Sequence, residues 1–191
     1  MHGSTLIEVL VAVLLFSLGL LGMVGMQAAS LQNDREARLQ ATAVRLAAEL
    51  AERMRGNRSV AALPTSTGNP YLQSDTVAAP AFSGEDCFST GCTTPMAVAQ
   101  WDVAEWLQRL FSPATGLPGA RVVVCFDSAP YDASGLPRWA CTNSGDIAHV
   151  KIGWTRISTD RSRTGAAAFD LATAAGSHPS VTLPIAAGWP S

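Results

Sequence analysis

The sequence predicts an α+β protein in which one long N-terminal helix, with its first half embedded in a membrane, packs on a small antiparallel sheet. Residues 9–26 are almost wholly apolar. As a helix they would span about 27 Å, close to the hydrocarbon thickness of a bilayer. Further along the chain, short stretches that alternate apolar and polar residues are separated by turn-rich segments, which is typical of antiparallel strands.

A single helix is expected from about Thr5 to Arg55, roughly 75 Å long by helical rise. Its second half has apolar residues at spacings of three or four, which place them on one face: Leu39, Ala43, Leu46, Leu50 and Met54. Gly56 and Asn57 then supply a stop. Only the first half fits a membrane, so the second half is expected to present its apolar stripe to something outside it.

Three glycines, Gly19, Gly22 and Gly25, interrupt the apolar half at intervals of three. Two interpretations remain open for them. Small residues allow close helix packing in membranes. Alternatively, each glycine costs about 1 kcal/mol relative to alanine and weakens the helix locally outside lipid.

Glu8 is a single carboxylate near the start of the apolar segment, with no other charged residue until Asp34. An ionised carboxylate in such a segment costs on the order of 2–3 kcal/mol or more unless it finds a partner. Glu8 therefore requires an explanation that the rest of the segment does not.

The remainder of the chain predicts a second helix and several strands. Residues 57–95 are rich in Pro, Gly, Ser and Thr and are expected to form a loop region packed on the long helix. A helix is expected to follow Thr94, with Pro95 in its first turn and apolar residues on one face up to Phe111. Strands are expected at residues 120–126, 139–142, 148–157 and 180–185, the last at a sheet edge because it contains Pro184. In the third strand, His149 and Lys151 are expected on the solvent face.

Four cysteines lie beyond the apolar segment: Cys87, Cys92, Cys125 and Cys141. An even number on the far side of a membrane anchor indicates an oxidising compartment such as the periplasm. Cys87 and Cys92 enclose a tight loop, and the other two lie on neighbouring predicted strands. Among the three possible connectivities we therefore favour 87–92 with 125–141. The spacing of Cys87 and Cys92 alone could serve zinc, but no second pair or nearby histidine completes such a site, so no metal is expected.

Composition and motifs give no indication of catalysis, of a cofactor or of nucleic-acid binding. The formal net charge is −2, which lacks the basic excess of a general nucleic-acid surface. Of the three histidines, His2, His149 and His178, none stands in a hydrolase or metalloprotease motif, and no phosphate-binding glycine loop occurs. We therefore expect a protein that is not an enzyme.

The N-terminus resembles that of the type IV pilin family. The residues that carry the resemblance are Gly3, Ser4, Thr5, Leu6, Ile7, Glu8, Val9 and Leu10. The resemblance implies that residues 1–3 are a prepilin leader, that prepilin peptidase cuts between Gly3 and Ser4, and that it methylates the new amine. It also implies that Glu8 helps a subunit to dock on the charged N-terminus of its neighbour. Ser4 stands where the family usually has Phe, and the leader lacks the usual basic residues.

Within the family, residues 94–157 look like the minor pilins called PilV, the type IV pilus modification proteins. The resemblance implies a filament-core helix half at 4–27, an exposed helix half at 28–56 and a periplasmic domain at 57–191. It implies an inner-membrane protein that enters the pilus fibre or tip. The implied partners are other minor and major pilins, prepilin peptidase, the inner-membrane assembly platform and a tip adhesin.

The leading functional hypothesis is therefore a minor pilin that helps to initiate assembly or forms part of the pilus tip, with roles in adhesion and twitching motility. Two alternatives remain open: a minor pseudopilin of a type II secretion system, and a membrane-tethered periplasmic enzyme or ligand-binding domain.

Overall fold

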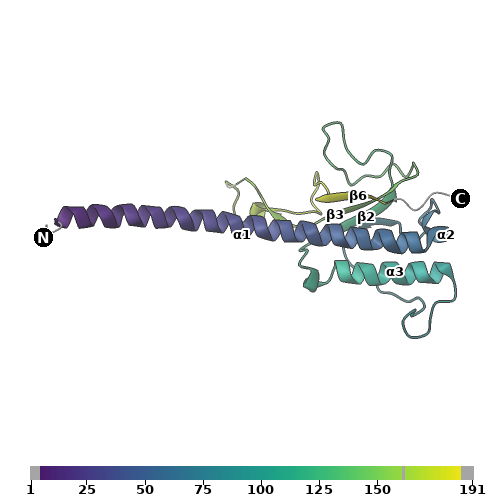
Figure 1. The fold of residues 1–191 in the computed structure, drawn as a ribbon. Coiled ribbons are helices and arrows are strands. Elements are labelled where there is room, and N and C mark those ends of the chain that lie inside the picture. The colour runs from purple at the N-terminus through teal and green to yellow at the C-terminus, as the bar shows by residue number, and fades with distance from the viewer. Residues whose placement is uncertain (1–4, 161, 186–191) are drawn as a thin grey trace. The chain divides into compact units, whose positions relative to one another are not determined.

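The computed structural model of the chain describes residues 5–160 and 162–185, which fall into two compact units divided between Arg38 and Leu39. Helix α1, Leu6–Gly56, supplies the described helix of the first unit and continues as the first element of the second (Figure 1). The long helix expected from about Thr5 to Arg55 is confirmed, to within one residue at each end.

The first half of α1 is apolar and entirely exposed. Every residue from Thr5 to Arg35 is exposed. An 18-residue window of α1 has a mean hydropathy of 2.6, so by length and composition the helix is able to cross a membrane. Among the described residues α1 is the single helix with that property.

The second unit contains a four-stranded antiparallel sheet with the order β1-β2-β3-β6. Its strands are β1, Gln73–Thr76; β2, Arg121–Phe126; β3, Ala148–Gly153; and β6, Val181–Ile185. Strand β6 lies at one edge, as expected from Pro184, which has no N–H to donate. A separate two-stranded sheet pairs β4, Arg156–Ile157, with β5, Phe169–Asp170.

Helix α3, Pro95–Leu110, is the second helix that the sequence predicts. Thr94 caps it, because its side-chain oxygen accepts a hydrogen bond from the backbone N–H of Ala97 at 3.1 Å. Pro95 occupies the first turn, where a missing N–H costs nothing. Three short elements complete the fold: α2, Arg58–Ala61; η1, Pro113–Thr115; and η2, Gly165–Ala168.

One hydrophobic core joins the second half of α1, helix α3 and one face of the four-stranded sheet. The predicted stripe of α1, from Leu39 to Met54, is buried in it. Strands β2, β3 and β6 contribute alternate residues that lie in register across the sheet: Val122, Val124, Phe126, Ala148, Val150, Ile152, Val181 and Ile185. Helix α3 runs alongside α1 (Figure 1) and contributes the fully buried Trp106, whose indole N–H donates to the carbonyl of Leu46 at 2.8 Å.

Three expectations for the second unit were wrong in part. Residues 57–95 are not only loop, since they contain α2 and β1; the buried Asn69 holds α2 by donating to the carbonyls of Ala61 and Leu63. Residues 139–142 form no strand. The strand expected at 148–157 ends at Gly153, because the N–H of Thr155 donates to Pro118 instead of continuing the ladder.

The outer face of β3 is buried, which corrects the expectation that His149 and Lys151 face solvent. Both side chains lie under the segment that connects β2 to β3. Lys151 is fully buried and its ammonium lies 2.5 Å from the carboxylate of Asp127, the first residue of that segment. It also donates to the carbonyl of Ala140 at 3.0 Å. A buried charge needs such partners. With them, this face of the sheet forms a second, polar layer instead of facing solvent.

Asp127 is ionised in this layer. Burial alone would raise the pKa of its carboxyl, but hydrogen bonds from Lys151 and from the backbone N–H groups of Ala129 and Thr142 outweigh burial and lower the pKa to about 2. The folded state therefore favours the carboxylate more than the unfolded chain does.

We predict that acid weakens this domain through Asp127. Because the pKa is lower in the folded state than in the unfolded chain, the stabilisation is complete above about pH 5 and is lost as the pH falls toward 2, by about 2 kcal/mol. Urea unfolding of residues 28–191 at pH 7, 5 and 3 measures this loss.

Asp127→Asn is the matched control for that measurement. The amide keeps an oxygen that accepts the backbone hydrogen bonds but leaves Lys151 without a carboxylate. We expect the variant to be about 3 kcal/mol less stable at pH 7 and to lose less stability between pH 5 and 3. An acid loss equal to that of the unmodified domain would show that Asp127 is not the titrating group.

The disulfide between Cys125 and Cys141 pins the same segment to β2. We predict that replacing both residues by serine lowers the free energy of unfolding by about 3 kcal/mol in the chain-entropy model. The control pair, Cys87 and Cys92, closes a shorter loop, with a sequence separation of 5 instead of 16. Its removal should cost about 1 kcal/mol less. Equal losses in urea unfolding would contradict the dependence on loop length.

Candidate functional site

Glu8 lies in the first turn of α1 and is exposed, as are its neighbours along the helix. A carboxylate there faces the positive end of the helix dipole, which is favourable. On the described part of the chain Glu8 forms no ion pair. Gly3 and Ser4, the residues expected at the cleavage and methylation site, lie outside the described residues.

Large apolar side chains surround this half of α1 on all sides and stay exposed. Burying one such side chain in a membrane or in a protein partner contributes about 1.5–3 kcal/mol. The most exposed of them, all at least 60% accessible, are Leu6, Ile7, Leu10, Val13, Leu15, Phe16, Leu21, Val24, Met26 and Leu31. A continuous exposed apolar surface marks a membrane or protein interaction site.

The glycines of this half have open space around them. A Cβ added at Gly19, Gly22 or Gly25 would meet no atom within 4 Å. No packing among the described residues therefore requires glycine at these positions.

Charged residues gather between α1 and α3, where they hold the two helices together. Arg53 donates to the carbonyl of Asp102 at 3.0 Å and to the carboxylate of Glu105 at 3.0 Å. Burial alone would lower the pKa of Arg53, but its carboxylate neighbours outweigh burial and raise it. The hydroxyl of Tyr71 donates to Asp102 at 2.8 Å, and burial together with that hydrogen bond raises the pKa of Tyr71. These charges are satisfied within the fold.

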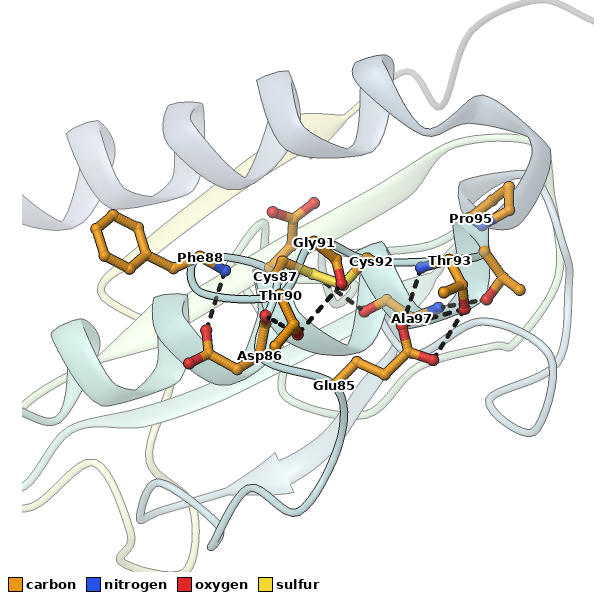
Figure 2. The surroundings of a disulfide bond; sticks show 12 residues. Glu85, Asp86, Cys87, Phe88, Thr90, Gly91, Cys92, Thr93, Pro95 and Ala97 are labelled. Atoms are coloured by element: carbon orange, nitrogen blue, oxygen red, sulfur yellow. Dashed lines mark hydrogen bonds between the residues drawn. A yellow bond between two sulfur atoms is a disulfide. The ribbon is translucent and has the colours of Figure 1, made fainter.

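The structure contains the two predicted disulfides, and the bridge between Cys87 and Cys92 closes an exposed loop in front of α3 (Figure 2). The loop carries Phe88, whose side chain is 93% exposed. The pattern of cysteines gave the pairing, but nothing in the sequence analysis singled out Phe88. Its signal is an aromatic residue inside a closed loop of otherwise small residues.

One cluster has ligand types that metals use. Cys125, Asp127 and Cys141 lie close together, but both sulfurs form the disulfide and the carboxylate binds Lys151. Of the histidines, His149 is buried with its Nδ1 unpaired, and His178 Nδ1 lies 2.8 Å from the carbonyl of Pro137. His2 lies outside the described residues. In the part of the chain that the structure describes, the sulfurs and the carboxylate of the cluster of Cys125, Asp127 and Cys141 are therefore engaged within the fold.

The comparison with protein families finds a similarity to pilins. Residues 25–104 match the Tt1218-like family, described as type IV pilin Tt1218. The match covers less than half of the chain and includes the second half of α1, most of α3 and the segment between them. It does not include Glu8. Neither the curated proteins nor the solved structures contain a significant match.

Three findings therefore agree: a long apolar N-terminal helix, a four-stranded antiparallel sheet that packs on the continuation of that helix, and the family match over residues 25–104. The fold is pilin-like, and the family model that matches residues 25–104 is that of a type IV pilin.

Proposed function

We propose that this protein is a minor type IV pilin, a structural subunit that helps to initiate pilus assembly or forms part of the pilus tip. The observation that carries the proposal is the exposed apolar half of α1 with its one carboxylate, Glu8, in the first turn. Lipid covers that half while the subunit is stored in the inner membrane. The apolar helices of neighbouring subunits cover it in the filament.

Glu8 sets the position of one subunit against the next. Cleavage after Gly3 creates a new ammonium group at Ser4, four residues before Glu8 in the sequence. An ammonium and a carboxylate that meet inside an apolar bundle compensate each other, whereas either one alone is strongly disfavoured there. The pair therefore forms in only one axial register between neighbouring subunits.

The minor pilins called PilV are the subclass that we propose. The support is the sequence of α3, β2 and β3, which resembles theirs, together with a single helix that could cross a membrane among the described residues. The proposed partners are other minor and major pilins, prepilin peptidase, the assembly platform and a tip adhesin. The disulfide-bonded domain at 57–191 is proposed to be periplasmic before assembly.

Deletion of the gene and a count of surface pili test the proposal. We expect fewer pili and reduced twitching, restored by the wild-type gene. Unchanged piliation with a loss of type II secretion would instead make the protein a pseudopilin. Unchanged piliation and secretion would contradict an assembly role altogether.

We predict that the mature protein begins at Ser4 with a methylated amine. Mass spectrometry of the membrane-extracted protein measures this mass. Gly3→Val should block the cut, because a branched side chain crowds the substrate cleft of the peptidase, and the chain should then keep its first three residues. A wild-type chain that begins at Met1 in cells with active prepilin peptidase would show that residues 1–3 are not a leader.

We predict that Glu8→Ala preserves membrane insertion and prevents incorporation into pili. Removing the carboxylate makes the helix more apolar, so insertion persists or improves. The ammonium of a neighbouring subunit then lacks its partner in an apolar bundle, so docking fails. The variant is expressed in the deletion strain at matched membrane levels, and sheared pili are probed for the subunit.

Glu8→Gln is the matched control, because it keeps the shape and a hydrogen-bonding oxygen but not the charge. We expect incorporation at or slightly above the level of Glu8→Ala. Wild-type incorporation of both variants would mean that Glu8 is only a residue at the membrane boundary.

A further inference from the structure

The loop between Cys87 and Cys92 exposes an aromatic ring that no described residue covers. Phe88 is 93% exposed, more than any other large apolar residue of the described chain, those of the membrane-compatible helix included. Figure 2 shows its ring directed away from the disulfide. An aromatic side chain is among the groups that contribute most when an interface buries them.

The loop is held in one conformation before any partner arrives. The disulfide closes it, and the carboxylate of Asp86 accepts hydrogen bonds from the N–H groups of Phe88 and Ser89 at 3.0 and 3.2 Å. The hydroxyl of Thr90 donates to the carbonyl of Asp86 at 2.8 Å. A side chain presented by a fixed backbone loses little conformational entropy on binding.

The stretch of sequence that contains Phe88 is acidic. Residues 59–108 contain five acidic residues and no Lys, Arg or His. Three of the five, Asp75, Asp102 and Glu105, form ion pairs with arginines elsewhere in the fold. The other two, Glu85 and Asp86, precede the loop directly, and on the described part of the chain neither forms an ion pair with a cation.

An exposed ring beside two unneutralised carboxylates restricts the kind of partner. Anionic lipid headgroups and nucleic-acid phosphates repel such a surface. A protein with an apolar pocket for the ring and Lys or Arg at the rim of that pocket complements it. One phenylalanine buries about 150–250 Å², well short of the roughly 1,200 Å² of a stable interface. The contact therefore works between subunits that another interface already holds together.

We propose that the Phe88 loop, residues 85–92, docks into an apolar pocket rimmed by Lys or Arg on a neighbouring pilin subunit. This inference rests on the proposed function, because assembly through α1 supplies the primary contact. The loop then selects which subunit stands beside this one.

Site-specific photo-crosslinking tests the inference in cells that assemble pili. A benzophenone amino acid replaces Phe88 in the full chain, and the same amino acid replaces Phe169 in a control, which is an exposed phenylalanine on β5. We expect an adduct with another pilin from position 88 and not from position 169. Peptide mapping should place the adduct on that pilin within reach of Lys or Arg.

Variants distinguish the contribution of the Phe88 ring from that of the charges on Glu85 and Asp86. In competition with the crosslinking subunit, Phe88→Ser should lower incorporation into sheared pili about tenfold, and Phe169→Ser should leave it unchanged. Glu85→Gln with Asp86→Asn keeps the acceptor oxygens of the loop and removes both charges, so it should lower the adduct yield at low salt and abolish its salt dependence. Thiol labelling confirms that Cys87 and Cys92 remain paired in each variant.

The outcomes distinguish this inference from the proposed function. If the wild-type subunit enters pili but position 88 gives no adduct, or one with lipid or with a protein other than a pilin, the docking proposal is wrong and the pilin role stands. If the wild-type subunit never enters pili, the assembly role itself fails. Normal incorporation of Phe88→Ser would also overturn the docking proposal.

Discussion

The two halves of helix α1 have different surfaces to bury, and the rest of the molecule follows from that constraint. Between Leu39 and Met54 its apolar residues form one stripe, which α3 and the four-stranded sheet cover. Between Leu6 and Met26 the apolar residues occur all round the helix, and they are exposed among the residues that the structure describes. The first half thus requires lipid or other helices, whereas the second half is satisfied by its own domain.

The domain is built to hold that second half firmly. Trp106 reaches across from α3 to the carbonyl of Leu46, and Arg53 connects α1 to Asp102 and Glu105. On the far side of the sheet, Lys151, Asp127 and the Cys125–Cys141 bridge attach the segment that connects β2 and β3. These contacts form a domain rigid enough to present surface loops such as the one that carries Phe88.

Periodicity in the sequence predicted the elements with long, regular patterns. The bounds of α1, the cap of α3 at Thr94 and strands β2 and β6 follow from local signals that the tertiary structure does not override. The prediction failed where long-range contacts decide. His149 and Lys151 have the alternation of a half-buried strand, but a pinned loop covers them, and alternation cannot reveal what lies over a sheet. Residues 139–142 have strand-forming composition, yet Cys141 is held by its disulfide and Ala140 by Lys151.

The candidate site was predictable to a similar extent. The position of Glu8 at the start of an apolar helix is visible in the sequence alone, as is the spacing of the four cysteines. The exposure of Phe88 is not visible, because a phenylalanine in a loop is as readily buried as exposed. Nor does the sequence show that, among the described residues, Glu85 and Asp86 lack the cationic partners that the other three acids of their segment have.

Membrane fractionation of two chains, the full protein and residues 28–191, tests most directly whether α1 divides into two halves with different partners. We expect the full chain to resist alkaline carbonate extraction, whereas residues 28–191 should be released in soluble form and unfold cooperatively in urea. Release of the full chain by carbonate would show that the first half does not need a membrane. A truncated chain without cooperative unfolding would show that the second half and its domain do not fold independently of the first.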